Sequence, residues 1–321
     1  MDTKIDLSIC IVSWNTADKL AECLRSIYEH DERLCIEVIV FDNASSDGSP
    51  ERVRSDFPQV NLIVGSANLG FGRGNNITIS KCRGKYILLL NPDMVVIEPC
   101  FKKMIYFLED NPSAGLVGCK LVNIYDIAQQ SYFHFFPTPI SELAWGSMVE
   151  NIYRYFHSSL EVVDPIKVAW LVGGCMLFRA DVLRELGGFD EDFFMYGEDL
   201  DLCYRLKKNG FEIYYLPGIK LLHYHGASSK RQAKSYFSAV MQRESVYKFM
   251  IKHYGIFKGL SFRAVWVLSS FLRVLLLAPV VGLCKMISNS DRVCWSQTLE
   301  KYLRVFSWGL GQEKWAHRGQ P

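Results

Sequence analysis

Residues 7–48, LSICIVSWNTADKLAECLRSIYEHDERLCIEVIVFDNASSDG, decide the fold class of this chain. The segment opens with an apolar run at 7–12 and closes with a second apolar run at 36–41, and polar residues follow each run. Between them, apolar residues recur at 20, 23, 24, 27 and 28, which is the spacing of an amphipathic helix. Thr16 is expected to cap that helix. The pattern therefore predicts strand, helix and strand in that order.

Two more apolar runs, at 60–64 and 86–90, continue this alternation. Continuous apolar strands that alternate with helices predict a mostly parallel central sheet flanked by helices, an α/β fold. Ligands bind at the carboxyl ends of the strands in such sheets. The polar clusters at 42–48 and 91–93 are expected to lie there.

The second half of the chain gives a less regular pattern. Residues 121–166 are aromatic and irregular, and periodicity predicts no structure for them. Residues 168–178 read as one strand interrupted by Gly173 and Gly174. Helices are expected at 180–186 and 200–208, and a strand at 211–216.

Composition excludes several classes of protein. The 321 residues are 49% hydrophobic and 22% charged with a net charge of +2, which argues against a disordered chain and against a general nucleic-acid binder. We expect no signal peptide, because Asp2, Lys4 and Asp6 interrupt the first residues. None of the ten cysteines forms a CxxC pair, so free buried thiols in a reducing cytosol are expected.

Charge is distributed unevenly along the chain. Residues 227–321 hold 15 Lys and Arg but only 4 Asp and Glu. Within them, residues 264–283 are apolar except for Arg273, and Arg263, Ser270 and Arg273 recur on one helical face. A helix lying in the membrane interface fits this pattern best. A membrane span and a soluble core or dimer helix are the alternatives.

Two strand ends carry candidate ligand-binding residues. Asp93, in Asn91-Pro92-Asp93, is placed to contact a hard divalent cation such as Mg²⁺, although Asn-Pro and Pro-Asp are also common turn pairs. Asp42 is placed to bind a ribose hydroxyl or a base N–H, although the residues after it also read as an ordinary turn. The glycine-rich segment 70–76 lacks the GxGxxG spacing and follows the third strand, which disfavours a nicotinamide-dependent oxidoreductase.

The densest acidic cluster spans residues 190–201, where six carboxylates lie among aromatic residues. A carboxylate beside aromatic rings is partly desolvated, which raises its pKa and suits a general base. Asp201 could instead complement the dipole of the predicted helix. His223 and His225 point to opposite sides of an extended chain, so one of them is expected to reach a metal site.

In this order the motifs resemble family 2 inverting glycosyltransferases of the GT-A fold, and the bacterial rhamnosyltransferase-like branch is the most similar. The resemblance covers about residues 5–230. It rests on SICIVSWNTADKLAECLRSI, VIVFDNASSDGS, ANLGFGRGNN, LLLNPD, LVGGCMLFRADVLRELGGFDEDFFMYGEDLDLCYRLKKNGF and HYHGASS.

The resemblance implies a role for each matching residue. Asp93 would contact Mg²⁺ or Mn²⁺ with His223, with His225 as the second choice, and Asn91 stands where the family usually has its first Asp. Asp199, beside Glu198 in the acidic motif, would be the catalytic base. The nucleotide sugar would be bound by Ser13, Asn15, Asp42, Asn68, Gly70, Arg73 and Asn91.

The expected function is an inverting, metal-dependent transfer of a sugar to a hydroxyl of a lipid-linked or cell-envelope glycan. L-Rhamnose from dTDP-rhamnose is the first choice; UDP-galactofuranose, UDP-hexoses and GDP-sugars stay open. A sugar-1-phosphate nucleotidyltransferase, a binding protein with a decayed site and a processive synthase are less favoured.

The expected organisation is a GT-A catalytic domain at 1–230 and a basic, helical, membrane-associating extension at 231–321. The nucleotide-binding half would occupy about 1–120, and the acceptor and catalytic half about 121–230. We expect a peripheral protein on the cytoplasmic face of the plasma membrane, with a homo-oligomer possible and no nucleic-acid partner.

Overall fold

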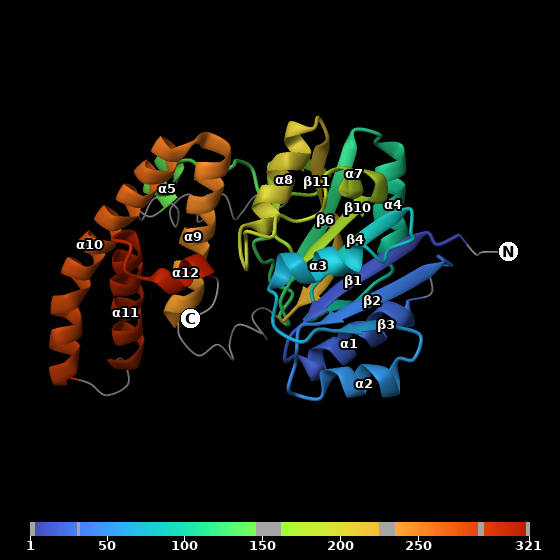
Figure 1. Cartoon of the computed structure of the whole chain (residues 1–321), viewed down its shortest axis with the longest axis horizontal. Helices are drawn as coiled ribbons and strands as arrows, with labels where there is room; N and C mark the ends of the chain where they lie inside the picture. The colour runs from blue at the N-terminus through green and yellow to red at the C-terminus, as the bar shows by residue number, and fades with distance from the viewer. Residues whose placement is uncertain (1–3, 31–32, 146–161, 225–234, 288–291, 319–321) are drawn as a thin grey trace. The chain divides into compact units, whose positions relative to one another are not determined.

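The computed structural model describes residues 4–30, 33–145, 162–224, 235–287 and 292–318 (Figure 1). The chain divides into two compact units. The sheet unit comprises residues 1–136, 162–194 and 198–231, and the helical unit comprises residues 137–161, 195–197 and 232–321. Each unit is described below by itself.

The sheet unit is built on a nine-stranded sheet with the order β3-β2-β1-β4-β10-β6-β11-β5, in which β8 pairs with β11. Its strands are β1 (Leu7–Ser13), β2 (Ile36–Asp42), β3 (Asn61–Val64), β4 (Tyr86–Leu90), β5 (Met94–Val96), β6 (Ala114–Val122), β8 (Ile166–Val168), β10 (Cys175–Arg179) and β11 (Glu212–His223). A separate two-stranded sheet joins β7 (Tyr132–Phe133) to β9 (Trp170–Leu171).

The parallel sheet predicted from the sequence is confirmed for β1 to β4, which pair in parallel with their neighbours. β10 is antiparallel to both β4 and β6, and β5 and β8 are antiparallel to β11. The single strand expected at 168–178 is wrong. The chain forms the end of β8, then β9 and β10 there, because residues 172–174 leave the sheet between them.

Helices cover both faces of this sheet. One core cluster takes side chains from α1 (Ala17–Glu29), α2 (Ser49–Asp56) and α4 (Phe101–Asp110). The cluster on the other face takes them from α3 (Phe71–Ile79), α7 (Ala180–Glu185) and α8 (Glu198–Lys208). The eight described free cysteines include seven that are buried, in keeping with the predicted buried thiols.

The start of α1 shows a cap that the sequence did not predict. Thr16 occupies the N-cap position but makes no side-chain capping bond, and its hydroxyl instead lies 2.9 Å from the Ser13 hydroxyl. The amide of Ala17 donates to Asp47 Oδ2 at 2.9 Å. A carboxylate from the loop after β2 therefore caps the helix that follows β1, which ties the two loops together.

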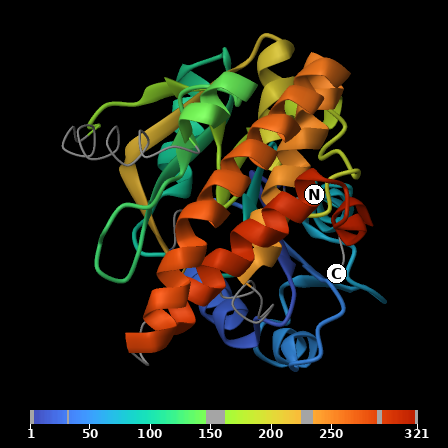
Figure 2. The ribbon, with the colours of Figure 1, turned by 90° about the vertical axis from the view of Figure 1, so that its left-hand side faces the viewer.

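The described part of the helical unit consists of five helices. They are α5 (Pro139–Trp145), α9 (Ser235–Tyr254), α10 (Ile256–Ile287), α11 (Arg292–Gly309) and α12 (Lys314–Arg318). α10 packs on both α9 and α11 (Figure 2). Residues Ile256–Pro279 of α10 are long and apolar enough to cross a membrane, with a mean hydropathy of 1.7.

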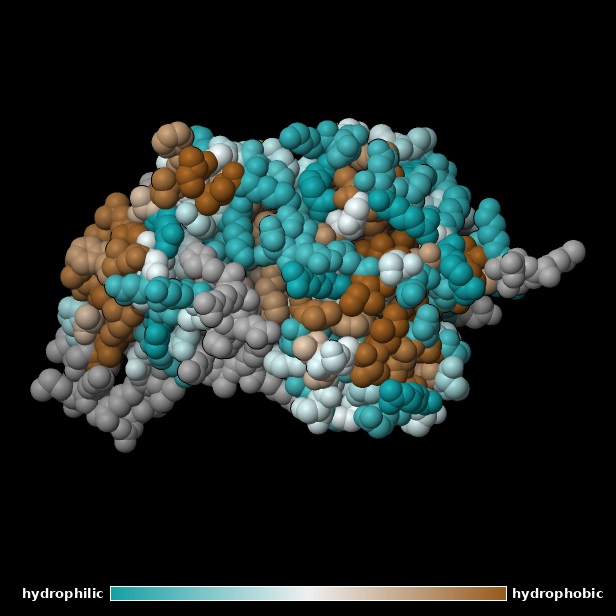
Figure 3. All heavy atoms as spheres, viewed as in Figure 1, coloured by the Kyte–Doolittle hydropathy of each residue, from teal (hydrophilic) through white to brown (hydrophobic). Residues whose placement is uncertain are grey.

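The face of α10 that carries Arg263, Ser270 and Arg273 lies within this helical packing. Arg263 donates from Nε to the Gly309 carbonyl at 2.9 Å and from Nη2 to the Trp308 carbonyl at 2.8 Å, and Ser270 is fully buried. A different face of α10 is exposed and apolar. This apolar stripe, which contributes to the hydrophobic surface in Figure 3, contains Phe257, Leu268, Phe271, Leu272, Leu275 and Leu276.

Candidate active site

The carboxyl ends of β1, β2 and β3 form one edge of the sheet. Ser13, the last residue of β1, stands opposite Asp42, the last residue of β2. Asp42 in turn stands opposite Val64, the last residue of β3. The polar loops that follow these strands therefore begin side by side, as the sequence predicted.

The rest of the sheet adds to the same edge. Leu90 at the end of β4 stands opposite Cys175, the first residue of the antiparallel strand β10. β6 and β11 run in the same direction as β4, so β11 also ends here, with His223 opposite Met94 of β5. The segments around Asp93, Gly174 and His223 consequently meet at the edge that carries Asp42.

The loops after β1 and β2 interlock around the Asp42 carboxylate. Asn15 donates its amide to Ser45 Oγ at 2.8 Å and accepts the Ser46 amide on Oδ1 at 2.8 Å. Asp42 accepts the Ser45 amide on Oδ2 at 2.9 Å. Its other oxygen, Oδ1, is buried and has no hydrogen-bond partner among the described residues. An acceptor of this kind calls for an external N–H or O–H donor.

Asn43 is a residue that the sequence analysis treated only as part of a turn. Its amide spans two loops, because Nδ2 donates to the Gly70 carbonyl at 3.1 Å and Oδ1 accepts the Leu69 amide at 2.7 Å. Asn68 Oδ1 accepts the Gly70 amide at 2.9 Å. The glycine-rich segment is thus held against the end of β2. The available signal was an Asn directly after a strand-end Asp.

Gly70 forms the turn that starts α3. Its φ is +85° with ψ near 180°, a conformation that is essentially restricted to glycine. An added Cβ would overlap the carbonyl oxygen of Phe194, which accepts the Phe71 amide at 3.0 Å. Arg73, in the first turn of α3, is half exposed and lies 3.3 Å from Glu191 Oε2. The acidic segment therefore packs over the glycine-rich turn.

Asn91-Pro92-Asp93 is a turn that also presents a carboxylate, so the two interpretations of this segment are compatible. The Met94 amide donates to the Asn91 carbonyl at 3.2 Å, and the Asn91 amide donates to the Gly174 carbonyl at 3.0 Å. The side-chain oxygen Oδ1 of Asn91 is buried and lacks a partner within the described ranges. Asp93 is 6% exposed.

His223 lies next to Asp93, with 3.6 Å between Nε2 and Oδ1. Gln129 holds this histidine at two points: Gln129 Oε1 lies 2.6 Å from His223 Nδ1, and Gln129 Nε2 donates to the His223 carbonyl at 2.9 Å. An acceptor beside Nδ1 favours the tautomer that carries its proton on Nδ1 and its lone pair on Nε2. Sequence analysis did not identify Gln129, because 94 residues separate it from His223.

Tyr224 fixes the chain directly after His223. Its amide donates to the Asp93 carbonyl at 3.1 Å, and its hydroxyl donates to Glu22 Oε1 at 2.5 Å. The Lys19 ammonium lies 3.2 Å from the centre of its ring. Helix α1 therefore anchors the segment that carries His223. His225 lies outside the described residues.

The donor set of Asp93 and His223 suits a divalent cation, since carboxylate oxygens and imidazole nitrogens are common metal ligands. Asn91 adds a buried amide oxygen without a partner at the same turn. No group of three or more His, Cys, Asp or Glu gathers as a metal site within the described parts of the chain. The protein thus offers a partial set of ligands, as Mg²⁺ sites completed by waters and substrate phosphates do.

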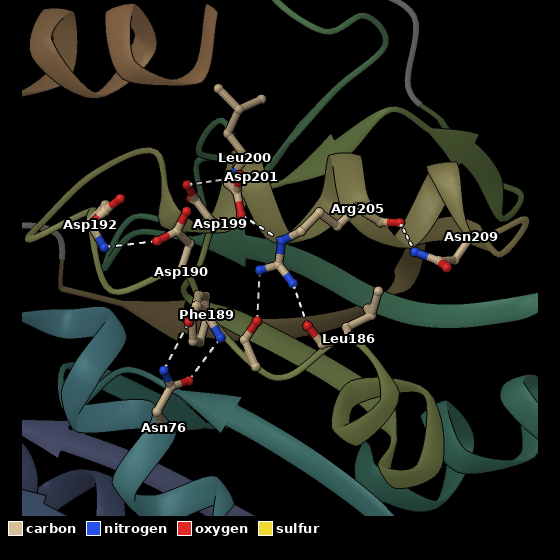
Figure 4. Close-up of polar contacts among 11 residues, drawn as sticks. Asn76, Leu186, Phe189, Asp190, Asp192, Asp199, Leu200, Asp201, Arg205 and Asn209 are labelled. Carbon is tan, nitrogen blue, oxygen red and sulfur yellow. Dashed lines mark hydrogen bonds and ion pairs between the residues drawn. The ribbon is translucent and has the colours of Figure 1, made fainter. Parts of the chain in front are cut away.

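Asp199 reaches the same edge through the loop before β10. Its Oδ2 accepts the Gly173 amide at 3.0 Å. Its Oδ1 accepts the Leu200 amide at 2.8 Å, as Figure 4 shows. Asp201, two residues further along α8, is fully buried and pairs with Arg205 at 2.7 Å. Arg205 also donates to the carbonyls of Leu186 and Gly188. Asp201 is therefore structural, whereas Asp199 is held by backbone amides.

Glu198 differs from its neighbour in environment. It is 6% exposed, and its Oε2 has no hydrogen-bond partner among the described residues. Burial, with the adjacent Asp199 carboxylate as a second cause, raises the pKa of Glu198 well above the usual range. Glu198 thus keeps its proton to a higher pH than an ordinary glutamate, so its neutral form is favoured at the start of α8.

These features define a class of protein: an α/β protein with a polar site at the carboxyl edge of a mostly parallel sheet, where a carboxylate–histidine pair and an acidic pair lie. Residues 8–187 match the model of the Glycosyl transferase family 2, and residues 154–226 match that of the N-terminal domain of galactosyltransferase. The first match covers more than half of the chain. This chain belongs to glycosyl transferase family 2.

Curated relatives include rhamnosyltransferases. The chain is 28% identical to the N-acetylglucosaminyl-diphospho-decaprenol L-rhamnosyltransferase of Mycobacterium tuberculosis over 274 residues, which are 78% of this chain and 85% of the relative. It is 27% identical to the rhamnosyltransferase WbbL of Escherichia coli over 241 residues, which are 72% of this chain and 86% of that protein. The chain is a glycosyltransferase with rhamnosyltransferase homologues.

Among solved structures, the mannosyltransferase PcManGT from Pyrobaculum calidifontis, in complex with GDP-Man and Mn²⁺, matches with a TM-score of 0.55 and 18% identity. That match covers 97% of this chain and 89% of the other. GalNAc-T7 with UDP, GalNAc and Mn²⁺ has the same TM-score at 15% identity, and covers 76% of this chain and 52% of its own. The GT-A fold expected from the motifs is confirmed.

Proposed function

We propose that this glycosyltransferase moves L-rhamnose from dTDP-rhamnose to a hydroxyl of a lipid-linked or cell-envelope glycan. The names of the two rhamnosyltransferase relatives support the sugar, and the name of the mycobacterial relative supports a diphosphate-linked lipid acceptor. The observation that carries the proposal is the meeting of three segments at one sheet edge: the Asp93–His223 pair, the Asp42 acceptor and the Asp199 carboxylate.

Asp199 is the base in this proposal. The two backbone amides that bind its carboxylate orient it, and a carboxylate oxygen can accept more than one hydrogen bond. Asp199 takes the proton of the acceptor hydroxyl as that oxygen bonds to the anomeric carbon. The bond from this carbon to the donor diphosphate breaks, and the diphosphate leaves with the electron pair. One displacement of this kind inverts the anomeric configuration.

Glu198 assists through its raised pKa. Burial and the adjacent Asp199 carboxylate raise this pKa, so the neutral form of Glu198 is favoured beside Asp199. A proton on Glu198 removes a negative charge next to Asp199, which favours the ionised form that can act as the base.

A divalent cation, Mg²⁺ or Mn²⁺, would supply neutralisation of the charge that develops on the leaving diphosphate. Asp93 and His223 would hold it, with His225 as the second histidine candidate. The titles of two structural neighbours name Mn²⁺, which supports the choice. Asp42 would accept a hydrogen bond from the nucleoside through the oxygen that has no partner within the described ranges.

The test is a panel of donors. Purified protein is incubated with dTDP-rhamnose, UDP-galactofuranose, UDP-glucose or GDP-mannose, with Mg²⁺, with Mn²⁺ or with EDTA, and thermal stability and nucleotide release are recorded. A donor at 100 times its Kd should add about 2.7 kcal/mol to the free energy of unfolding. We expect dTDP-rhamnose with Mn²⁺ to give the largest shift. If no donor has an effect with either cation, the proposal is wrong.

The same proposal places the protein on the cytoplasmic face of the plasma membrane, with α10 in the interface. The apolar stripe supports this placement, and so does the excess of Lys and Arg in residues 227–321, because anionic lipid attracts basic segments. A span by α10 is disfavoured, because α9 and α11 pack on it and would bring Lys248 and Lys301 into the hydrocarbon.

A further inference from the structure

Three hydrogen-bond donors around Trp266 lack acceptors. Trp266, on α10, is 4% exposed, and its indole Nε1 has no partner among the described residues. Arg243, on α9, donates from Nη1 to the Ala239 carbonyl at 3.0 Å, but its Nε is buried without a partner in the described ranges. Arg273, two turns along α10 from Trp266, shows aromatic contacts but no ion pair or hydrogen bond from its side chain within those ranges.

These side chains lie close together within the helical unit. The guanidinium carbon of Arg243 is 4.3 Å from the centre of the Trp266 ring, and that of Arg273 is 6.0 Å from the same centre. Arg273 also lies 4.9 Å from the centre of the Tyr302 ring on α11. Ring faces attract the two cations but do not replace an oxygen acceptor for Arg243 Nε or for the Arg273 guanidinium.

The three groups cannot satisfy one another, since arginine and the indole are donors only. Burial is the largest cause and lowers the pKa of Arg243, the Glu142 carboxylate and Tyr302 raise it, and Arg273 adds a smaller lowering. The buried acids of the unit are engaged elsewhere: Glu244 accepts from Trp308 Nε1 at 2.7 Å, and Glu313 binds Arg304 and Trp315. Among the described residues, then, no carboxylate forms an ion pair with Arg243 or Arg273.

An oxyanion with several oxygens would complete the cluster. Phosphate suits it, because the planar guanidinium forms paired, charge-assisted hydrogen bonds with phosphate oxygens. Leu272 and Leu276 of the apolar stripe flank Arg273 at one and three residues along α10, and Leu276 is 72% exposed. An apolar surface next to a phosphate site matches a lipid with a phosphate headgroup.

We propose that Trp266, Arg243 and Arg273 form a binding site for the phosphate group of a lipid headgroup. The inference that a lipid carries this phosphate rests on the membrane association proposed above. The inference that the site binds a phosphate rests on the three donor side chains alone. The site lies entirely within the helical unit and shares no residue with the proposed nucleotide-sugar site.

The test compares three variants of the full chain, each with one substitution on α10. Trp266→Phe keeps the ring and removes only the N–H, and Arg273→Gln removes one donor group and one charge. Lys258→Gln is the matched control, because Lys258 is an exposed residue of the same helix and its loss removes the same charge. Binding to phosphatidylcholine vesicles that contain phosphatidic acid is measured by flotation in EDTA, and binding of inorganic pyrophosphate is measured by calorimetry.

We expect Arg273→Gln to weaken vesicle binding about tenfold or more relative to Lys258→Gln, and Trp266→Phe about two- to tenfold relative to wild type. Equal losses in Arg273→Gln and Lys258→Gln, with none in Trp266→Phe, would overturn the site. Saturable pyrophosphate binding that depends on Arg273, together with unchanged vesicle binding of Arg273→Gln, would show that the site binds a free phosphate compound and not a lipid headgroup.

Donor binding is measured in parallel with dTDP and Mn²⁺. We expect all three variants to bind dTDP as the wild type does, and Asp199→Asn to bind vesicles as the wild type does. If the wild type does not bind dTDP, the proposed function is contradicted, whereas the proposed phosphate site is not tested by that result and stands or falls on vesicle binding. Failure of the vesicle comparison would contradict the phosphate site alone.

Discussion

The Asp199 carboxylate accepts the backbone amide of Gly173, with 3.0 Å between Oδ2 and N. Gly173 precedes β10, whose first residue pairs with the last residue of β4. The acidic pair at the start of α8 is thereby tied to the sheet edge that carries Asp93 and His223. The proposed base Asp199 and the candidate metal ligand Asp93, which are 106 residues apart in sequence, thus lie at one edge of the sheet.

Metal affinity should depend on Gln129. Gln129→Leu removes both contacts that orient His223, and loss of such an outer partner typically weakens metal binding about 10–100-fold. Titration calorimetry with Mn²⁺ in the presence of dTDP measures the change. Gln130→Leu, at the exposed neighbouring position, is the control and should bind Mn²⁺ as the wild type does. Equal affinities in the two variants would remove Gln129 from the site.

Stability should fall with rising pH because of Glu198. Its pKa is raised in the folded state, so between the ordinary and the raised pKa the folded protein holds a proton that the unfolded chain has released. The contribution of this proton to the free energy of unfolding is fully present below the ordinary glutamate pKa of about 4.3. It is lost as pH rises toward the raised value, by at most about 1.4 kcal/mol per pH unit. Glu198→Gln should abolish that decline in urea denaturation at several pH values.

The control for this pH experiment is Glu29→Gln, at an exposed position near the end of α1. It should reproduce the wild-type dependence of unfolding free energy on pH. A Glu198→Gln variant with the wild-type slope would show that the Glu198 proton is not held in the folded state.

Gly70→Ala should destabilise the fold. The backbone there has φ of +85° and ψ near 180°, and the added methyl would overlap the Phe194 carbonyl oxygen. The conformation alone costs about 1–3 kcal/mol for a residue other than glycine. Gly218→Ala is the control, because a Cβ at Gly218 meets nothing within 4 Å. Equal midpoints of denaturation in the two variants would contradict this account of the turn.

The apolar stripe of α10 should determine membrane binding. Phe271→Glu places a charge at an exposed position of the stripe and removes an aromatic anchor, so flotation with anionic vesicles should weaken about tenfold or more. Tyr125→Glu makes the same kind of change at a 75% exposed residue of the sheet unit and should leave flotation unchanged. If both variants float like the wild type, α10 does not contact lipid through this face.

Periodicity and strand-end chemistry predicted much of the sheet unit. The runs at 7–12, 36–41 and 86–90 became β1, β2 and β4, and Asp42 and Asp93 lie where strand ends predicted. Local patterns could not reveal the antiparallel insertion of β10 between β4 and β6, since strand order depends on pairing between distant segments. The same limit hid Gln129, whose partner is 94 residues away.

The tail shows a different limit. Spacing placed Arg263, Ser270 and Arg273 on one face of a helix, and that grouping was right. Sequence alone does not say which face of this helix is buried, because either the polar face or the apolar face could pack against other helices. In the structure Arg263 reaches the carbonyls at the end of α11 and Ser270 is buried, so packing between helices decided which face stayed exposed.

The most direct test of the central claim is the effect of Asp199→Asn on turnover and on donor affinity in the same preparation. The substitution keeps the shape of the side chain but removes the base, so nucleotide release in the presence of acceptor should fall by about 10²–10⁴. The Kd for dTDP-rhamnose with Mn²⁺ should stay within about twofold of the wild type. Turnover near the wild-type rate would contradict Asp199 as the base.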